Sequence, residues 1–466
     1  MRASRAGTAS LVLALLVAAL AIRVAHVEAT SYRAINDAGT FNRLASEIAR
    51  TGDYDTGSRP GSGAGGSRGP SAYFPPGFQY FLAGVDRLDG HEAGGRSAVS
   101  PERISQAVLG TLAVGLIGLV ALEAFGPAVG LIALALAAFY PVLIEDSGLL
   151  IGENLLIVFE LAATWTALRA RRAGAKGGRA VLGWIAATGV LTGLATLTHE
   201  NAFLMLIPLG VAASSAPARR RPQALASVAL LLITAALTVA PWTIRNAIEL
   251  HRFVPVSDET GITLVGAYNP DSAAFHRLPY KWRFYFQIRQ DAALMRHAGR
   301  LTEPQLNDRL LSQAEDYVGQ HPLAPLSVGF HNTLRMLELE GPFAYQASAA
   351  ALNLDIGTAR IGVFSFWILG ALALLGLLTR FVRRAPLWLW AIPLLFALSV
   401  VFINVETPRF REPIEPFVVM LAACALAVPA TRAASWFSGR SPVRGGRKPV
   451  PATRDRQLVE VVERLA

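Results

Sequence analysis

The sequence predicts an all-α protein that crosses a membrane many times, and three observations carry this prediction. Of its 466 residues, 53% are hydrophobic and 16% are charged, with a mean hydropathy of +0.40, which is too apolar for a soluble enzyme of this length. Apolar stretches of about 17 to 25 residues, the length that spans a bilayer, recur along the chain. Short runs of Lys and Arg separate them, as in polytopic membrane proteins.

We expect about ten membrane-spanning helices, which form three groups. The first helix occupies residues 1–27, helices two to seven occupy 103–244, and helices eight to ten occupy 359–430. The individual spans are expected at 10–27, 103–123, 127–144, 149–170, 180–197, 201–215, 224–243, 361–381, 385–404 and 413–430. The sixth is the shortest.

The first 29 residues have a second interpretation. Arg2 and Arg5 precede an apolar run from Ser10 to Ile22, and Ala29 is a small residue beyond that run. This pattern also resembles a cleavable signal peptide. In either case, the chain that follows is exported.

A cytoplasmic N-terminus places every basic run on the cytoplasmic side, in agreement with the positive-inside rule. The runs lie at 169–179, 218–222, 380–384 and in the tail 431–466. The same topology exports two long segments, residues 28–102 and 245–358. Since the net charge of +10 comes from loops of this kind and no nucleic-acid-binding module accompanies it, nucleic acid is not an expected partner.

The exported segment 28–102 is expected to combine a helix with a mobile loop. Residues 37–54 carry apolar side chains at helical spacing, which predicts an amphipathic helix along the outer membrane surface. These side chains are Phe41, Leu44, Ala45 and Ile48. Residues 57–70 are rich in Gly, Ser and Pro and cannot bury a core, so they predict a mobile loop.

The exported segment 245–358 is expected to contain a helix at 303–322 that ends at Pro322. The one cysteine, Cys424, lies in an apolar span, where packing is its expected role. A single cysteine allows neither an intramolecular disulfide nor a cysteine-based metal site.

Ionisable residues gather at the outer ends of the expected spans, which indicates a shared site there, because charges at a membrane edge are costly and usually functional. These residues are Asp37, Glu145, Asp146, His199, Glu200, Arg245, Glu406, Arg409 and Arg411, and all of them except Glu200 and Glu406 are candidate site residues. Asp37 could act as the base that deprotonates an acceptor hydroxyl, or could only cap the helix that follows it. Glu145 and Asp146 could bind a divalent cation or a donor hydroxyl, or could cap a helical hairpin.

The three arginines suit a phosphate, because a guanidinium group binds phosphoryl oxygens bidentately and stays charged. For each of Arg245, Arg409 and Arg411, the alternative is a side chain that extends to lipid headgroups. His199 could be a metal ligand, a phosphate hydrogen-bond donor or a structural hydrogen-bonding group.

Several strings, in their order and spacing, resemble one family. They are NDAGTF at 36–41, YFPPGFQYF at 73–81, AFYPVLIEDSGLLIGENLL at 138–156, APWTIRN at 240–246 and RFREPIEPFVVMLAA at 409–423. The chain resembles the bacterial relatives of dolichyl-phosphate-mannose-protein mannosyltransferases (glycosyltransferase family 39) and of the lipid A aminoarabinose transferase, which share the GT-C membrane fold. The match runs from the first span to about residue 430.

The resemblance implies an inverting glycosyltransferase that moves a sugar from a polyprenyl-phosphate carrier to a cell-envelope protein, lipid or glycan outside the cytoplasmic membrane. By position, Asp37 matches the family's first-loop catalytic acid, and Glu145 or Asp146 matches the acidic residue of the next outer loop. The arginines match basic positions near the carrier phosphate. A divalent cation, Mg²⁺ or Mn²⁺, is a further expectation.

Two departures from the family pattern are present. The mannosyltransferases often carry paired acidic residues after the first span, whereas Asp37 is flanked by Asn36 and Ala38, and His199 stands where relatives commonly have arginine. Two alternatives from other classes stay open: a transporter or flippase of lipid-linked sugars, which should carry polar residues at mid-span, and a non-catalytic scaffold of the cell envelope.

Overall fold

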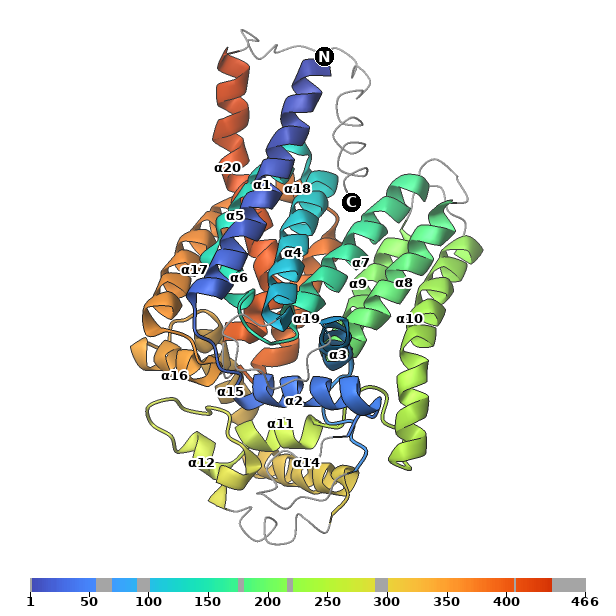
Figure 1. The fold of residues 1–466 in the computed structure, drawn as a ribbon, viewed down its shortest axis with the longest axis vertical. Helices are drawn as coiled ribbons and strands as arrows, with labels where there is room; N and C mark the ends of the chain where they lie inside the picture. The colour runs from blue at the N-terminus through green and yellow to red at the C-terminus, as the bar shows by residue number, and fades with distance from the viewer. Residues whose placement is uncertain are drawn as a thin grey trace.

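The computed structural model describes residues 2–55, 69–89, 101–174, 180–215, 221–289, 301–405 and 408–437. Across these ranges every extended element is a helix, and the only strand-like pairing is an isolated bridge between Asp55 and Pro70. Figure 1 shows a long helical bundle with a layer of shorter helices beneath it.

The bundle contains the apolar helices. They are α1 (Arg2–Ala29), α4 (Pro101–Phe125), α5 (Pro127–Phe139), α6 (Pro141–Asp146), α7 (Glu153–Gly174), α8 (Ala180–Thr198), η1 (Glu200–Met205), α9 (Leu206–Ser214), α10 (Arg221–Glu249), α17 (Ile356–Leu377), α18 (Arg380–Arg384), α19 (Leu387–Val401), η5 (Pro408–Ile414) and α20 (Glu415–Phe437).

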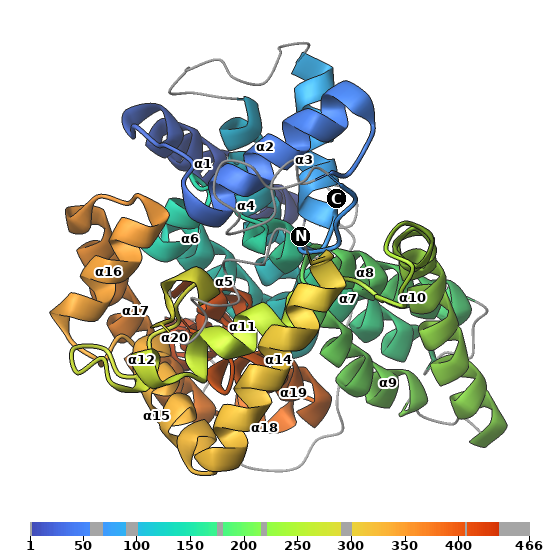
Figure 2. The ribbon, with the colours of Figure 1, turned by 90° about the horizontal axis from the view of Figure 1, so that it is seen from below.

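The layer contains the helices of the two long segments that the sequence predicts to be exported. They are α2 (Asn36–Thr51), α3 (Gly77–Asp89), α11 (Thr260–Ala267), α12 (Pro270–Ala273), η2 (Tyr285–Gln287), α14 (Glu303–Gln320), α15 (Ala324–Met336) and α16 (Pro342–Leu352). Seen from below, α11 and α14 lie side by side across the end of the bundle (Figure 2).

Six of the described helices are long and apolar enough to cross a membrane. They are Gly7–Ala29, Pro101–Phe125, Ala180–Thr198, Arg221–Glu249, Ile356–Leu377 and Arg409–Ala430. The other four expected spans fall on α5, α7, η1 with α9, and α19, each of which is shorter or more polar. The all-α fold class is therefore confirmed. Six of the ten expected spans are supported by the length and composition of their helices.

Two expected spans have different limits in the structure. The span expected at 127–144 is broken at Tyr140, because Pro141 starts a new short helix, α6. The span expected at 149–170 starts only at Glu153, after a non-helical stretch that ends at Gly152. This stretch brings the N-terminus of α7 to the lower end of the bundle.

Small residues let α8 and α10 pack closely. A Cβ atom added at Gly189 would lie 2.4 Å from the Leu231 carbonyl oxygen, and one added at Gly193 would lie 2.9 Å from that of Ala235. Glycines four residues apart share one helix face, and such pairs allow helix backbones to approach within a membrane. Larger residues at 189 or 193 would separate the two helices.

Two buried arginines fasten α1 to its neighbours. Arg23, which has no exposed surface, donates to the Ser147 hydroxyl and to the carbonyls of Ala137 and Ala138. Arg103 donates to the carbonyls of Val27 and Gly148. Because these carbonyls lie at helix ends, the guanidinium groups satisfy acceptors that the helices leave free.

The amphipathic helix expected at 37–54 is present as α2, which lies across the lower end of the bundle (Figure 1). Its buried residues are Ala38, Leu44, Ala45 and Ile48, and Phe41 is half-buried. The helix ends at Gly52, whose φ of +86° suits a residue without a side chain. The loop expected at 57–70 falls outside the described residues except for its last two.

The helix expected at 303–322 is present as α14. Thr302 and Gln305 form a reciprocal capping box at its start, and the helix ends before Pro322. Its first residue, Glu303, reaches the other predicted exported segment, where its carboxylate accepts hydrogen bonds from the Ser71 hydroxyl at 2.6 Å and the Ala72 amide at 2.7 Å.

We expect Glu303→Gln to lower the free energy of unfolding by about 1–3 kcal/mol, because one of the two buried donors loses its charged acceptor. Thermal unfolding in detergent measures this change. Glu315→Gln, at an exposed position of the same helix, is the matched control and should unfold like the wild type. Equal stability of the two variants would contradict the anchoring role of Glu303.

Candidate functional site

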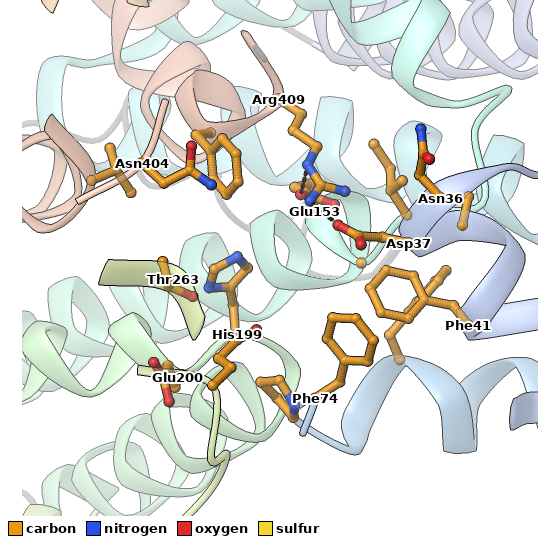
Figure 3. A pocket seen from close by; sticks show the side chains of 18 of the residues that line it. Asn36, Asp37, Phe41, Phe74, Glu153, His199, Glu200, Thr263, Asn404 and Arg409 are labelled. Carbon is orange, nitrogen blue, oxygen red and sulfur yellow. Dashed lines mark hydrogen bonds and ion pairs between the residues drawn. The ribbon is translucent and has the colours of Figure 1, made fainter. Parts of the chain in front are cut away.

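A large pocket lies where the lower end of the bundle meets the layer of shorter helices. About 1600 Å³ of unfilled space, including space open to solvent, is bounded by α2, the start of α7, η1, α11, α16, α19 and η5. Figure 3 shows side chains from distant parts of the chain pointing into this space. The lining combines apolar and charged side chains, as in a substrate site.

The first wall of the pocket carries an ion pair between Asp37 and Arg409 (Figure 3). Asp37 lies in the first turn of α2, where the helix N-terminus favours a carboxylate. Arg409 lies in η5, 372 residues further along the chain, and its guanidinium also faces the Glu153 carboxylate at 3.7 Å. The Asp37 and Arg409 side chains stay 29% and 14% exposed, so both are accessible from the pocket.

Glu153 is the second carboxylate beside Arg409. It is the first residue of α7, and its side chain is only 5% exposed. Arg409 donates to Asp37 from Nη2 while its Nε lies 3.7 Å from the Glu153 carboxylate, so the guanidinium is oriented by one hydrogen bond and by a second negative charge. Arg409 also lies over the Phe410 ring, with its central carbon 5.0 Å from the ring centroid.

The second wall is acidic. Glu200, at the start of η1, accepts a hydrogen bond from the Ser257 hydroxyl, and Glu259 precedes α11. Burial, and then the neighbouring Glu200 and Asp37 carboxylates, raise the pKa of Glu259 well above its usual value, against a smaller opposite effect of Arg409. Between the two walls, His199 projects into the pocket (Figure 3).

Aromatic rings complete the lining. Phe41 packs edge-on against Phe74 and Phe78, with ring centroids 4.8 Å and 5.7 Å away. Across the pocket, Trp282 and Phe284 meet in a T-shaped contact with centroids 4.6 Å apart. These rings surround the charged residues with apolar surface, which strengthens electrostatic interactions in the pocket.

The structure brings three of the seven predicted site residues into this pocket: Asp37, His199 and Arg409. The other four lie elsewhere. Arg245 donates to the carbonyls of Tyr54 and Ser71, at 2.8 Å and 2.7 Å, and lies over the Trp242 ring. Arg245 therefore joins Tyr54 and Ser71 by hydrogen bonds.

Arg411 is buried beneath the pocket. Its guanidinium pairs with Glu415, faces Glu338 at 3.6 Å and donates to the Met336 carbonyl at 2.7 Å. Its central carbon lies 3.6 Å from the centroid of the Phe366 ring. These contacts use its donors within the protein.

Glu145 and Asp146 are also buried outside the pocket. Glu145 lies against α17, where a Cβ atom added at Gly362 would come within 3.0 Å of the carboxylate. Burial, and then Asp146, raise the pKa of Glu145 to about 9. Asp146 interacts with Arg23 and Glu412. The acidic turn thus faces helix packing and not the pocket lining.

The expectation of a divalent cation has little support in the donor set. Among the described residues, no group of three or more His, Cys, Asp or Glu side chains could hold a metal ion. The pocket carboxylates Asp37 and Glu153 face Arg409, which already supplies the positive charge between them. We therefore derive no chemical step through a metal.

Sequence reasoning missed Glu153, Glu259 and the aromatic pair. Glu153 lies in the string at 138–156, where the sequence predicts only Glu145 and Asp146 as site residues. The pair lies in KWRFYF at 281–286, a dense aromatic cluster in a predicted exported segment and a signal of a binding surface.

Comparisons with known proteins agree with this fold. Residues 74–244 match the family model of dolichyl-phosphate-mannose-protein mannosyltransferases. The archaeal oligosaccharyltransferase AglB from Archaeoglobus fulgidus, solved in complex with an inhibitory peptide and a dolichol-phosphate, matches with a TM-score of 0.55 at 16% identity, over 97% of this chain and 54% of that chain. The same enzyme in the apo form matches with a TM-score of 0.54 at 14% identity, over 97% and 54%.

A third structure of the archaeal enzyme, in complex with Zn and sulfate, matches with a TM-score of 0.53 at 15% identity, over 92% of this chain and 50% of that chain. The chain thus spans about half the length of the solved enzyme that it matches. No curated protein matches the sequence significantly.

The chain shares the fold of the archaeal oligosaccharyltransferase, and over residues 74–244 it is similar to the dolichyl-phosphate-mannose-protein mannosyltransferases. Both findings confirm the expected resemblance to GT-C membrane glycosyltransferases.

Proposed function

We propose that this protein transfers a sugar from a polyprenyl-phosphate carrier to an acceptor hydroxyl on the exoplasmic face of the cytoplasmic membrane. The observation that carries the proposal is the Asp37–Arg409 pair, which joins a potential base and a potential phosphate ligand in one accessible pocket. The archaeal neighbour solved with a dolichol-phosphate supports a lipid-phosphate donor.

In the proposed reaction, Arg409 binds the phosphate of the donor. The guanidinium group then exchanges part of its contact with Asp37 for phosphoryl oxygens and remains oriented by Glu153. Asp37 becomes free to accept a hydrogen bond from the acceptor hydroxyl. A positively charged group at the leaving phosphate stabilises the negative charge that develops there.

The acceptor oxygen attacks the anomeric carbon from the face opposite the phosphate, which inverts the configuration. The bond between the anomeric carbon and the phosphate oxygen breaks, and its electron pair stays on the carrier phosphate. Asp37 takes the proton of the acceptor hydroxyl as general base. The products are the glycosylated acceptor and the polyprenyl phosphate.

Incubation of the purified full chain with a panel of polyprenyl-phosphate sugars tests this function. We expect release of polyprenyl phosphate from at least one donor, by transfer or by slower attack of water, and loss of that release in Asp37→Asn. A panel in which every donor stays intact in the presence of membrane acceptors would overturn the proposal.

One observation favours a second candidate, a transporter of lipid-linked sugars. Glu160, within α7, is fully buried, and neither of its carboxylate oxygens has a hydrogen-bond partner in the described part of the chain. An ionisable group inside a helical bundle can mark a transport route. Flipping of a fluorescent polyprenyl-phosphate sugar in proteoliposomes, lost in Glu160→Gln, would support this candidate.

A further inference from the structure

The wall of the pocket that faces Asp37 and Arg409 carries a different set of side chains. It combines the carboxylates of Glu200 and Glu259 with the rings of Trp282 and Phe284. The donor phosphate in the proposed function uses the Arg409 side. The acidic and aromatic side therefore remains for the other substrate, since acidic side chains do not attract a phosphate.

The aromatic part of this wall is held in place. The Trp282 indole donates to the Thr263 carbonyl at 3.0 Å and lies against Gly266, where an added Cβ atom would fall 2.1 Å from the indole nitrogen. The Phe284 ring is fixed between Trp282 and Phe286, on which it stacks with centroids 5.0 Å apart. Rings fixed in this way present apolar faces without loss of side-chain freedom on binding.

The carboxyl part supplies hydrogen bonds of both kinds. Glu200 accepts from Ser257 and retains further lone pairs on its carboxylate. Glu259, whose pKa is raised by burial and by its acidic neighbours, can donate in its protonated form as well as accept. A hydroxyl group needs such partners, because it is donor and acceptor at once.

We propose that this wall is the acceptor subsite and that the acceptor is a carbohydrate, whose ring stacks on Trp282 and Phe284 while its hydroxyl groups bond to Glu200 and Glu259. The proposal rests on the proposed function and names its second substrate. Sugar rings combine an apolar face of C–H groups with a rim of hydroxyls, which is the complement of an aromatic surface edged by carboxyls.

A peptide acceptor fits this wall less well. An extended peptide gains affinity by pairing its backbone with a free strand edge. In the described residues that line this wall, the backbone belongs to the helix α11 and to a short irregular segment beside η2, and the two are already bonded to each other, since the Arg283 amide donates to the Gly266 carbonyl. This wall therefore offers side chains, and not a free backbone edge, for substrate binding.

The test separates donor cleavage from acceptor use. The purified full chain is given a polyprenyl-phosphate sugar that it cleaves slowly in water, and release of polyprenyl phosphate is followed as acceptor surrogates are added. The surrogates are methyl α-mannopyranoside, methyl β-glucopyranoside, methyl α-arabinofuranoside and a threonine-containing peptide. We expect at least one glycoside, and not the peptide, to accelerate release and to become glycosylated.

Trp282→Leu and Glu259→Leu should each raise the KM for the active glycoside about tenfold, while the KM for the donor and the rate of release in water stay within about twofold. Phe253→Leu and Glu249→Leu, at exposed positions outside the lining, are the matched controls and should behave like the wild type. Saturation-transfer NMR should show glycoside C–H contacts that Trp282→Leu removes.

Three outcomes would overturn the acceptor subsite: acceleration by the peptide alone, an unchanged KM for the glycoside in both variants, or equal loss of donor cleavage and acceptor use in both. In each of these, wild-type donor cleavage persists and the proposed function stands. Absence of any donor cleavage by the wild type overturns both.

Discussion

Replacement of Asp37 by Asn should lower the rate of sugar transfer by about 10²–10⁴-fold, the contribution typical of a positioned general base. The amide cannot take a proton from the acceptor hydroxyl, although it occupies the same space in the first turn of α2. Initial rates of polyprenyl-phosphate release, measured with and without acceptor, give the size of the effect.

The Asp37 variant should insert and fold normally, because the residue lies at the pocket and its side chain is partly exposed. Glu47→Gln is the matched control: Glu47 belongs to the same helix, pairs only with Arg50 in a surface contact and lies outside the pocket lining. Wild-type transfer by Asp37→Asn in membrane vesicles would remove this carboxylate from the mechanism.

Arg409 and Arg411 lie two residues apart, and their substitution should affect two different properties: donor binding for Arg409 and stability for Arg411. Arg409→Lys keeps the charge and loses the planar fork, so we expect the KM for the donor to rise by about 10- to 150-fold while the protein stays folded. Arg411→Ala leaves Glu415 and Glu338 buried without their cation, so we expect a loss of about 3–5 kcal/mol in unfolding free energy.

Donor titrations and thermal unfolding on both variants separate these roles. Each arginine is the control for the other, since both belong to η5 and differ in what their guanidinium groups contact. A stable Arg411→Ala protein with impaired donor binding, or an unstable Arg409→Lys protein with normal donor binding, would contradict the assignment.

The helices were predictable where the signal is local. Helix α2 follows from the spacing of Leu44, Ala45 and Ile48, and α14 follows from its period and from Pro322. Breaks within spans were harder: Pro141 marks one break plainly, whereas the non-helical stretch before Glu153 depends on packing against other helices.

The candidate site was predictable only in part, because a residue's place along the chain fixes its depth in the membrane but not the direction of its side chain. Asp37 and Arg409 were expected at the outer ends of spans, and both reach the pocket. Glu145 and Asp146 lie in a neighbouring turn, and the rotation of α6 against α17 turns them inward. Glu259 comes near Asp37 only through the folding of a long segment.

The hydrogen bonds of Arg245 can form only late in the synthesis of the chain. The carbonyls of Tyr54 and Ser71 gain their guanidinium donor only when Arg245 is synthesised, 191 and 174 residues later, which is a delay of about 9–38 s at ordinary rates of synthesis. During that interval Tyr54 and Ser71 lack the guanidinium group that joins them. Nascent chains halted before α10 should therefore be more sensitive to protease at Tyr54 and Ser71 than chains that include Arg245.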